Sequence, residues 1–281
     1  MTIAEAMKKA MIELKNGKIE FPKLKSRLLM QYILNETRQY VIVNDMEELD
    51  KNKEKQYFMA IKKIRQGYPI EHITHQKEFM KLNFFVDENV LIPRQDTEIL
   101  VEEVINIAKK NNSVKILDLC TGSGAIAVSL AKYLPQAQIT AIDISKEALK
   151  IAKKNAISND VEDKIIFINS DMFTNLNENK FDIIVSNPPY IKTNVIKDLG
   201  NEVKREPYIA LDGGQDGLDF YKKIIKESNQ YLKYGGYLCL EIGFDQKIDI
   251  IELIENEDKF EKTYSKKDLF NNDRVIVTKL K

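Results

Sequence analysis

Apolar residues recur at helical spacing through residues 1–68. Ile3, Ala6 and Ala10 lie three or four positions apart, which is typical of a helix that buries one face. A second run with this spacing begins at Pro22, a residue type favoured in the first turn of a helix. The pattern predicts a small helical bundle over residues 1–68 as the first domain of the chain.

The pattern changes between Ile70 and Ile92, where apolar residues lie in short β-rich segments. Phe84 and its neighbours supply the aromatic and β-branched side chains that strands favour. We therefore expect residues 69–93 to form a β-hairpin linker that joins the bundle to a larger domain over residues 94–281.

The larger domain alternates apolar runs with helical stretches, after a first helix over about Asp96–Lys110. Strand, helix and strand in this order predict a doubly wound, mostly parallel sheet. Two further runs, Phe260–Tyr264 and Arg274–Leu280, predict an antiparallel hairpin at the edge of the sheet. The fold class is therefore α/β, with seven strands. The five central strands are expected at Val114–Leu119, Gln138–Asp143, Lys164–Asn169, Asp182–Ser186 and Tyr237–Ile242.

Charge and cysteine content narrow the class of function. Lys plus Arg and Asp plus Glu each number 43 among the 281 residues, so the chain lacks the strong positive field of a dedicated nucleic-acid binder. Cys120, Cys239 and the two histidines are too few for a disulfide framework or a standard zinc site. We expect no metal and a reducing, cytoplasmic location. The chain has neither a signal-peptide core nor a run of about 18 apolar residues, so we expect no membrane association.

A glycine-bearing segment, VKILDLCTGSGAIA, occupies residues 114–127. It places Asp118 near the end of a strand, and Gly122 and Gly124 at the start of a helix. Glycine there permits a tight turn and a close approach of backbone to ligand, and the start of a helix favours negative charge. Asp143, at the end of the next strand, is suited to bind two ribose hydroxyls. The segment predicts a ligand that contains adenosine.

The spacing Gly-x-Gly-x-x-Ala also satisfies the dinucleotide pattern of NAD enzymes. Two aspartates favour S-adenosylmethionine. Asp118 suits the ammonium of a methionine moiety and would repel a pyrophosphate, and Asp171 suits an adenine amino group. Each aspartate also fits a plain structural role, at a strand end or as a helix cap. Together, these positions at successive strand ends are similar to the class I methyltransferase pattern.

The chemistry is expected at Asn187-Pro188-Pro189-Tyr190, which follows the fourth central strand at the edge where open α/β sheets bind ligands. The prolines stiffen this loop and supply no N–H, so their carbonyls remain free acceptors. When the Asn187 side-chain oxygen and the Pro188 carbonyl each accept one N–H of a planar NH₂ group, the lone pair on that nitrogen is directed at a methyl carbon. Tyr190 is suited to stack on the substrate. The expected reaction is an in-line displacement that needs no metal.

On these residues the sequence resembles the PrmC/HemK family. The resemblance also rests on Leu91-Ile92-Pro93-Arg94-x-x-Thr97-Glu98 and on the segment from Glu206-Pro207 to Asp216-Gly217-Leu218. It continues in Leu240-Glu241-Ile242-Gly243 with Gln246, and in Lys267-Asp268-Leu269 with Asp273-Arg274-Val275. The match covers nearly the whole chain.

The resemblance implies a class I, Rossmann-like domain that transfers a methyl group from S-adenosylmethionine to N5 of the glutamine in the GGQ motif of class 1 peptide release factors. The release factor is then the partner, docked by the helical bundle. We expect a monomer with no obligatory nucleic acid. Expected cofactor contacts are Asp118, Cys120, Thr121, Gly122, Ser123, Gly124, Asp143, Asp171, Met172 and Asn187. Expected substrate contacts are Asn187, Pro188, Pro189 and Tyr190, with Asn187, Pro188 and Tyr190 as the catalytic set.

Three alternatives remain open. An adenine or guanine amino-methyltransferase acting on DNA or RNA would use the same acceptor chemistry, and residues 1–85 carry 16 basic against 11 acidic side chains. A hydride-transferring NAD enzyme would share the glycine spacing, and a binding module would keep the pocket without catalysis.

Two further features have architectural interpretations. Arg94 and Glu98 are interpreted as an ion pair that braces the hairpin against the larger domain. The glycine-rich segment from Glu206 to Leu218 is interpreted as a loop that closes over the acceptor. Met172 stands where proteins of the family often have Trp, so stacking against adenine stays an open question.

Overall fold

The computed structural model describes residues 1–109, 113–177, 180–261 and 263–281. The chain divides into two units. Unit 1 contains Met1–His75 together with Gly200–Arg205, and unit 2 contains Gln76–Leu199 together with Glu206–Lys281.

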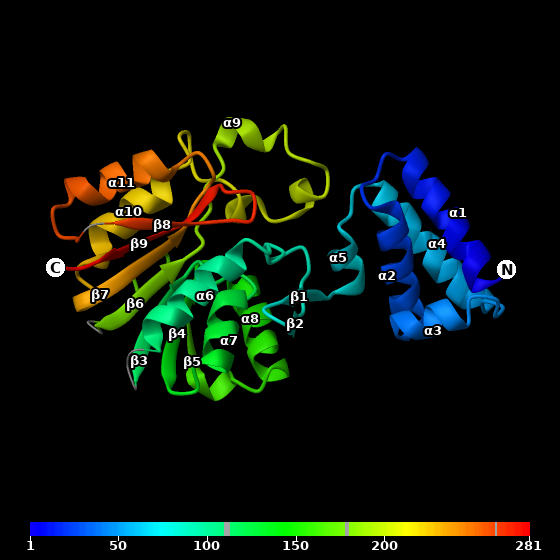
Figure 1. Cartoon of the computed structure of the whole chain (residues 1–281), viewed down its shortest axis with the longest axis horizontal. Coiled ribbons are helices and arrows are strands. Elements are labelled where there is room, and N and C mark those ends of the chain that lie inside the picture. The colour runs from blue at the N-terminus through cyan, green and yellow to red at the C-terminus, as the bar shows by residue number, and fades with distance from the viewer. Residues whose placement is uncertain (110–112, 178–179, 262) are drawn as a thin grey trace. The chain divides into compact units, whose positions relative to one another are not determined.

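Helices with buried apolar faces build unit 1 and confirm the predicted helical bundle (Figure 1). Its first helix begins with a capping box, in which the Thr2 hydroxyl accepts from the Glu5 N–H and the Glu5 carboxylate accepts from the Thr2 N–H. Leu14, Leu29 and Tyr57 are fully buried in its apolar core. The helices are α1 (Ile3–Asn16), α2 (Pro22–Leu34), α3 (Arg38–Val43), α4 (Lys51–Arg65) and α5 (Ile70–Thr74).

A two-stranded hairpin, β1 (Lys77–Phe79) and β2 (Leu82–Phe84), opens unit 2. This hairpin is shorter than the pattern predicted, because residues 70–74 are helical and the apolar residues after β2 form no strand. These apolar residues are buried against helix α8 (Lys146–Ser158), so helix packing explains the pattern that suggested a strand. They are Val86, Val90 and Ile92.

The main sheet has seven strands in the order β5-β4-β3-β6-β7-β9-β8. Neighbours from β5 to β7 run parallel, and β9 runs antiparallel to both β7 and β8. The predicted doubly wound sheet with its C-terminal antiparallel hairpin is confirmed. The strands are β3 (Val114–Leu119), β4 (Ala137–Asp143), β5 (Ile165–Asn169), β6 (Phe181–Ser186), β7 (Leu232–Glu241), β8 (Tyr264–Lys267) and β9 (Asp273–Lys279).

Helices cover both faces of this sheet (Figure 1). One face carries α6 (Thr97–Ala108), α7 (Ala125–Tyr133) and α8, and the other carries α10 (Asp219–Ser228) and α11 (Lys247–Asn256). Each face buries its own apolar cluster. Shorter helical segments are η1 (Glu162–Lys164), α9 (Thr193–Ile196), η2 (Val203–Arg205) and η3 (Tyr208–Ala210). The expected helix end at Lys110 lies outside the described residues, and no helix within the described ranges is long and apolar enough to cross a membrane.

One predicted strand is displaced. The expected strand Phe260–Tyr264 includes residue 262, which lies outside the described residues, and Phe260 forms only an isolated bridge with Leu280. The strand observed is β8, which ends at a tight turn that leads into β9. There the Asp268 carboxylate accepts from the N–H groups of Phe270 and Asn272. Its sequence, Tyr-Ser-Lys-Lys, is largely polar, so no apolar run revealed it.

A buried asparagine on α8 ties two segments of unit 2 together. Asn155 accepts from the Phe85 N–H at 2.7 Å, and its Nδ2 donates to the carbonyls of Phe85 at 3.0 Å and Ser123 at 2.9 Å. The side chain is fully buried, so water cannot readily replace these hydrogen bonds when the Asn155 side chain is removed.

We predict that Asn155→Ala lowers the free energy of unfolding by about 2–3 kcal/mol, because it leaves three polar backbone groups without partners. Urea denaturation measures this change. Asn256→Ala, at an exposed position near the end of α11, is the control and should change stability by less than about 0.5 kcal/mol. Equal losses in the two variants would contradict the structural role of Asn155.

Candidate active site

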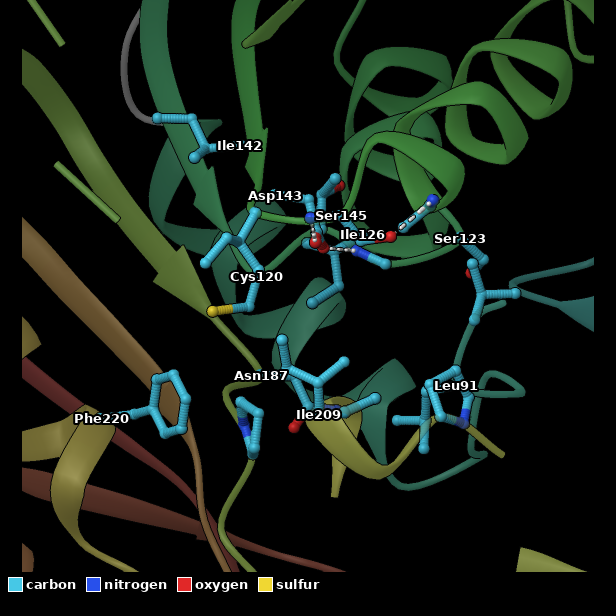
Figure 2. Close-up of a pocket in the computed structure, with 18 of the residues that line it drawn as sticks. Leu91, Cys120, Ser123, Ile126, Ile142, Asp143, Ser145, Asn187, Ile209 and Phe220 are labelled. Atoms are coloured by element: carbon cyan, nitrogen blue, oxygen red, sulfur yellow. Dashed lines mark hydrogen bonds between the residues drawn. The ribbon is translucent and has the colours of Figure 1, made fainter. Parts of the chain in front are cut away.

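A cavity of about 430 Å³ lies at the carboxyl ends of β3 to β6, and its size is typical of small-molecule sites. Its walls also include the segment before α6, residues 207–210 and the start of α10. In Figure 2, Asn187 and Asp143 lie on opposite sides of this cavity. The expected site residues that line it are Cys120, Thr121, Gly122, Ser123, Asp143, Asp171, Met172, Asn187 and Pro189. Four other described residues of the expected set, Asp118, Gly124, Pro188 and Tyr190, do not line it.

The loop after β3 needs a left-handed backbone at three positions. Cys120, Gly122 and Gly124 have φ values of +59°, +54° and +79°. At Gly122 and Gly124, glycine adopts this conformation without strain. A Cβ on Gly124 would lie 2.9 Å from the Cβ of Ala152, so this glycine permits close packing of α7 against α8. Gly122 has open space around it, and its N–H donates to Asp143 Oδ2 at 2.8 Å. Gly124 therefore serves the packing of two helices, whereas Gly122 binds Asp143 through its backbone.

Asp143 is held by backbone groups on both oxygens. Besides the Gly122 bond, the Ser145 N–H donates to its Oδ1 at 2.8 Å (Figure 2). Burial raises the pKa of Asp143, and these N–H groups oppose that rise by stabilising the carboxylate. Each carboxylate oxygen accepts more than one hydrogen bond. The anchored carboxylate is thus able to receive a pair of hydroxyl groups from a ligand in the cavity.

Asp118 lies behind the loop and is fully buried. Its Oδ2 accepts from the Thr121 hydroxyl at 2.6 Å, and its Oδ1 has no hydrogen-bond partner within the described part of the chain. Burial raises the pKa of Asp118 to about 7, which the bond from Thr121 partly offsets. Thr121 lines the cavity and Asp118 does not, so Asp118 contacts the wall of the cavity through Thr121.

The rim at the end of β5 carries an ion pair that the sequence did not reveal. Asp171 Oδ1 lies 3.0 Å from Lys223 Nζ, and both residues line the cavity. Met172 follows in a left-handed conformation with φ of +49° and is 5% exposed. This arrangement gives the rim an acceptor, a cation and a thioether face.

The tetrapeptide after β6 presents Asn187 and Pro189 to the cavity. Asn187 Nδ2 donates to Thr97 Oγ1 at 3.2 Å. This bond uses the amide nitrogen and leaves the side-chain oxygen of Asn187 out of the contact. Ser186, just before it, donates its hydroxyl to the Leu119 carbonyl at 2.8 Å and anchors the strand end to β3. Tyr190 packs against the core on the α10 and α11 side of the sheet, and burial raises its pKa.

A second loop packs directly on the tetrapeptide. A Cβ on Gly213 would lie 2.7 Å from the Tyr190 Cα and 2.9 Å from the Pro189 oxygen, and both of these are backbone atoms. Gln246 joins the two loops by donating from Nε2 to the carbonyls of Tyr190 at 3.1 Å and Gly217 at 3.0 Å. The tetrapeptide Asn187–Tyr190 is therefore held by close backbone packing as well as by its prolines.

Arg94 and Glu98 have separate partners, so the expected pair between them is wrong, and Arg94 also lines the cavity. Arg94 forms an ion pair with Glu206, whose other carboxylate oxygen accepts from the Ile92 N–H at 3.0 Å. Glu98 accepts from the Met80 N–H at 2.6 Å. The partner of Arg94 lies more than one hundred residues away in the sequence, so no local pattern indicated it.

Sequence reasoning missed several residues of this site. Thr97 and Glu241 belong to motifs that supported the family resemblance, yet nothing in their spacing indicated that they lie beside Asn187. Ile209 and Phe220 line the cavity and are ordinary apolar residues in the sequence. Among the described residues, no group of three or more His, Cys, Asp or Glu side chains is arranged to hold a metal ion.

Similarity to family models and to solved structures shows the class of protein to which the larger unit belongs. The family model "Methyltransferase small domain" matches residues 95–206, and the model "PrmC N-terminal domain" matches residues 5–74. A solved methyltransferase from Pyrococcus furiosus has the same fold, with a TM-score of 0.53 and 17% identity over 82% of this chain and 98% of that one. A ribosomal protein L11 methylase from Lactobacillus delbrueckii subsp. bulgaricus gives a TM-score of 0.51 and 19% identity, over 67% and 80% of the chains. The larger unit thus has the fold of a methyltransferase.

Sequence relatives then define the family. A release factor glutamine methyltransferase from Clostridium acetobutylicum is 42% identical over 99% of this chain and 98% of its own length. The protein of the same name from Moorella thermoacetica is 41% identical over 88% of this chain and 87% of its own. The chain belongs to the family of release factor glutamine methyltransferases, as the resemblance indicated.

We predict that Gly213→Ala lowers kcat for methyl transfer on the order of a hundredfold, because the new Cβ pushes the tetrapeptide out of position. A radiolabel transfer assay measures this loss, and far-ultraviolet circular dichroism should show the parent's helix content. Gly200→Ala is the control, since a Cβ there meets nothing within 4 Å. Parent-like turnover in Gly213→Ala would show that close packing of the two loops is not needed.

Proposed function

We propose that this chain transfers the methyl group of S-adenosylmethionine to N5 of the glutamine in the GGQ motif of class 1 peptide release factors. One observation carries the proposal: Asn187 lines the same cavity as Asp143 and the glycine loop. The proposed acceptor for an amide NH₂ and the proposed acceptor for ribose hydroxyls thus line one cavity. Membership of the glutamine methyltransferase family supports the substrate class.

The residues present fit S-adenosylmethionine. The anchored carboxylate of Asp143 would receive the ribose hydroxyls, and the backbone from Cys120 to Gly124 would lie along the methionine part. Asp171 and Met172 would contact the adenine, where the thioether of Met172 offers a polarisable face. Asp118 would act through Thr121. When bound, S-adenosylmethionine supplies a methyl group activated by a sulfonium.

The acceptor residues make an unreactive amide nitrogen reactive. The lone pair of a glutamine NH₂ is delocalised into its carbonyl, so free glutamine attacks poorly. In our proposal, Asn187 Oδ1 and the Pro188 carbonyl each accept one N–H, which holds the nitrogen with its lone pair toward the methyl carbon. A nitrogen–carbon bond forms as the carbon–sulfur bond breaks, and the nitrogen then loses one proton to water. The roles of the Pro188 carbonyl and of Tyr190 stay predictions, because neither residue lines the cavity.

The partner and location follow from this substrate. A glutamine presented by a release factor needs recognition of the body of that protein, and we assign this docking to the helical bundle and its hairpin. We further propose that the protein works as a monomer in the cytoplasm and without nucleic acid. The primary test is incubation with methyl-labelled S-adenosylmethionine and a purified release factor. Label must appear on the wild-type factor and be absent when the GGQ glutamine is replaced.

We predict that Asn187→Ala lowers kcat by on the order of a hundredfold or more while leaving the Kd for S-adenosylmethionine within about threefold, because the lost acceptor acts on the reacting nitrogen. Turnover assays and calorimetry measure the two quantities. A loss confined to cofactor binding would place Asn187 outside the acceptor site.

We predict that Asp143→Ala has the opposite profile, since its carboxylate is assigned to the ribose. The Kd for S-adenosylmethionine should rise on the order of a hundredfold or more, since two hydrogen bonds to a charged acceptor contribute about 3–6 kcal/mol. Asp182→Ala is a matched control, because its carboxylate pairs with Lys233 and accepts from Lys115 N–H outside the cavity. Unchanged affinity in Asp143→Ala would reject the ribose assignment.

A further inference from the structure

Glu241 is a buried carboxylate that the mechanism above does not use. It ends β7 and is 2% exposed, and it does not line the cavity. Its backbone carbonyl accepts from the Tyr221 hydroxyl at 2.8 Å, which fixes the strand end. Its Oε2 has no hydrogen-bond partner within the described ranges. A buried carboxylate with an unpartnered oxygen is costly for folding and points to a functional reason for its presence.

The neighbours of this carboxylate are the groups that hold Asn187. Burial raises the pKa of Glu241 to about 7, and hydrogen bonds from the side chains of Thr97 and Asn187 lower it. Asn187 Nδ2 in turn donates to Thr97 Oγ1 at 3.2 Å. Strands β6 and β7 are paired in parallel with Ser186 opposite Leu240, so Asn187 and Glu241 follow side by side at the ends of these strands. Glu241, Thr97 and Asn187 therefore lie together behind the acceptor site.

The donor and acceptor count of this network decides which way the Asn187 amide faces. An asparagine amide fits its site in two orientations that exchange oxygen and nitrogen. A threonine hydroxyl alone is compatible with either orientation of the amide, since it can donate a hydrogen bond or accept one. An ionised carboxylate only accepts, so it attracts the Thr97 hydrogen and the Asn187 NH₂ and disfavours the amide oxygen.

We propose, on the basis of the function proposed above, that Glu241 is a positioning residue that directs the Asn187 amide so that its oxygen faces the substrate. With the amide reversed, Oδ1 would lie against the carboxylate, and the NH₂ group would face a substrate NH₂ that has only donors to offer. Glu241 thus acts through Asn187 and touches neither the cofactor nor the glutamine.

The test compares turnover and cofactor binding in matched variants. Glu241→Gln replaces one acceptor oxygen with a donor, so it permits the reversed amide. It should lower kcat on the order of tenfold or more and leave the Kd for S-adenosylmethionine within about twofold. Glu103→Gln is the control, since Glu103 is also buried, at 8% exposure, and accepts from the Tyr264 hydroxyl away from the cavity. Parent-like kcat in Glu241→Gln would overturn the proposal.

The Thr97 hydroxyl provides a second set of variants. Thr97→Val should lose turnover like Glu241→Gln, and the double variant should lose little more than the worse single variant, because both changes break the same network. Thr97→Ser keeps the hydroxyl and should recover most of the turnover lost in Thr97→Val. Fully additive losses would show that Glu241 acts independently of Thr97 and would overturn the proposal.

A pH profile separates positioning from a merely structural role. Charged or titratable groups around the Glu241 carboxylate are Arg274 on β9, Asp96 before α6, Tyr190 in the tetrapeptide and Tyr221 on α10. Arg274 Nε lies 3.2 Å from Asp96 Oδ2. The Asp96 carboxylate offsets part of the Arg274 charge, so Arg274 stabilises the Glu241 carboxylate only in part. Protonated Glu241 becomes a donor, so kcat should fall as the pH drops through about 7.

Glu241→Gln does not titrate, and its kcat should lose this acid limb. Asp118 also has its pKa raised to about 7, and a limb that persists in Glu241→Gln would belong to Asp118 and contradict the proposal.

A measurement without turnover keeps the two proposals distinguishable. The Asn187 side-chain NH₂ should give one pair of ¹⁵N–¹H signals in the parent, identified by their loss in Asn187→Asp. In Glu241→Gln these signals should shift or split as the reversed amide becomes populated. If the parent methylates no release factor, the proposed function fails, and these signals still decide the role of Glu241: unchanged signals overturn it, and shifted or split signals support it.

Discussion

The proposed mechanism depends on one constraint, which is that the amide oxygen of Asn187 at the end of β6 is held still and turned toward the cavity. Everything close to Asn187 contributes to that constraint. Ser186 anchors the strand end to β3, Thr97 accepts from the amide nitrogen, and the prolines that follow limit the backbone. A flexible acceptor would lose orientation entropy in each turnover, so rigidity here is itself a contribution to rate.

The fold supplies this rigidity by bringing distant segments to one edge of the sheet. Parallel strands place their carboxyl ends side by side, so the glycine loop, Asp143 and the tetrapeptide meet although they are far apart in sequence. The loop around Gly213 and the side chain of Gln246 then close on the tetrapeptide from the other side. Such packing needs glycine because backbone lies directly against backbone. In the proposed mechanism, the geometry of the sheet therefore contributes more than any strongly acidic or basic group.

Much of this arrangement was predictable because it follows local rules. The alternating pattern predicted the sheet, and strand-end positions predicted Asp143, Asp171 and Asn187 as neighbours of one cavity, which the structure bears out as placement. The predictions that failed concern tertiary partners. The pairing of Arg94 with Glu206 and the polar strand β8 depend on segments that no local pattern connects. The positions of Thr97 and Glu241 beside Asn187 could not be predicted for the same reason, since the three residues come from segments that are distant in sequence.

The most direct measurement of the central claim is a crystal structure of the protein with S-adenosylhomocysteine and a release factor that presents its GGQ glutamine. The account predicts the glutamine NH₂ within hydrogen-bond distance of both Asn187 Oδ1 and the Pro188 carbonyl, with its nitrogen facing the cofactor sulfur. A glutamine bound away from these two oxygens, or facing the nitrogen of the Asn187 amide, would contradict it.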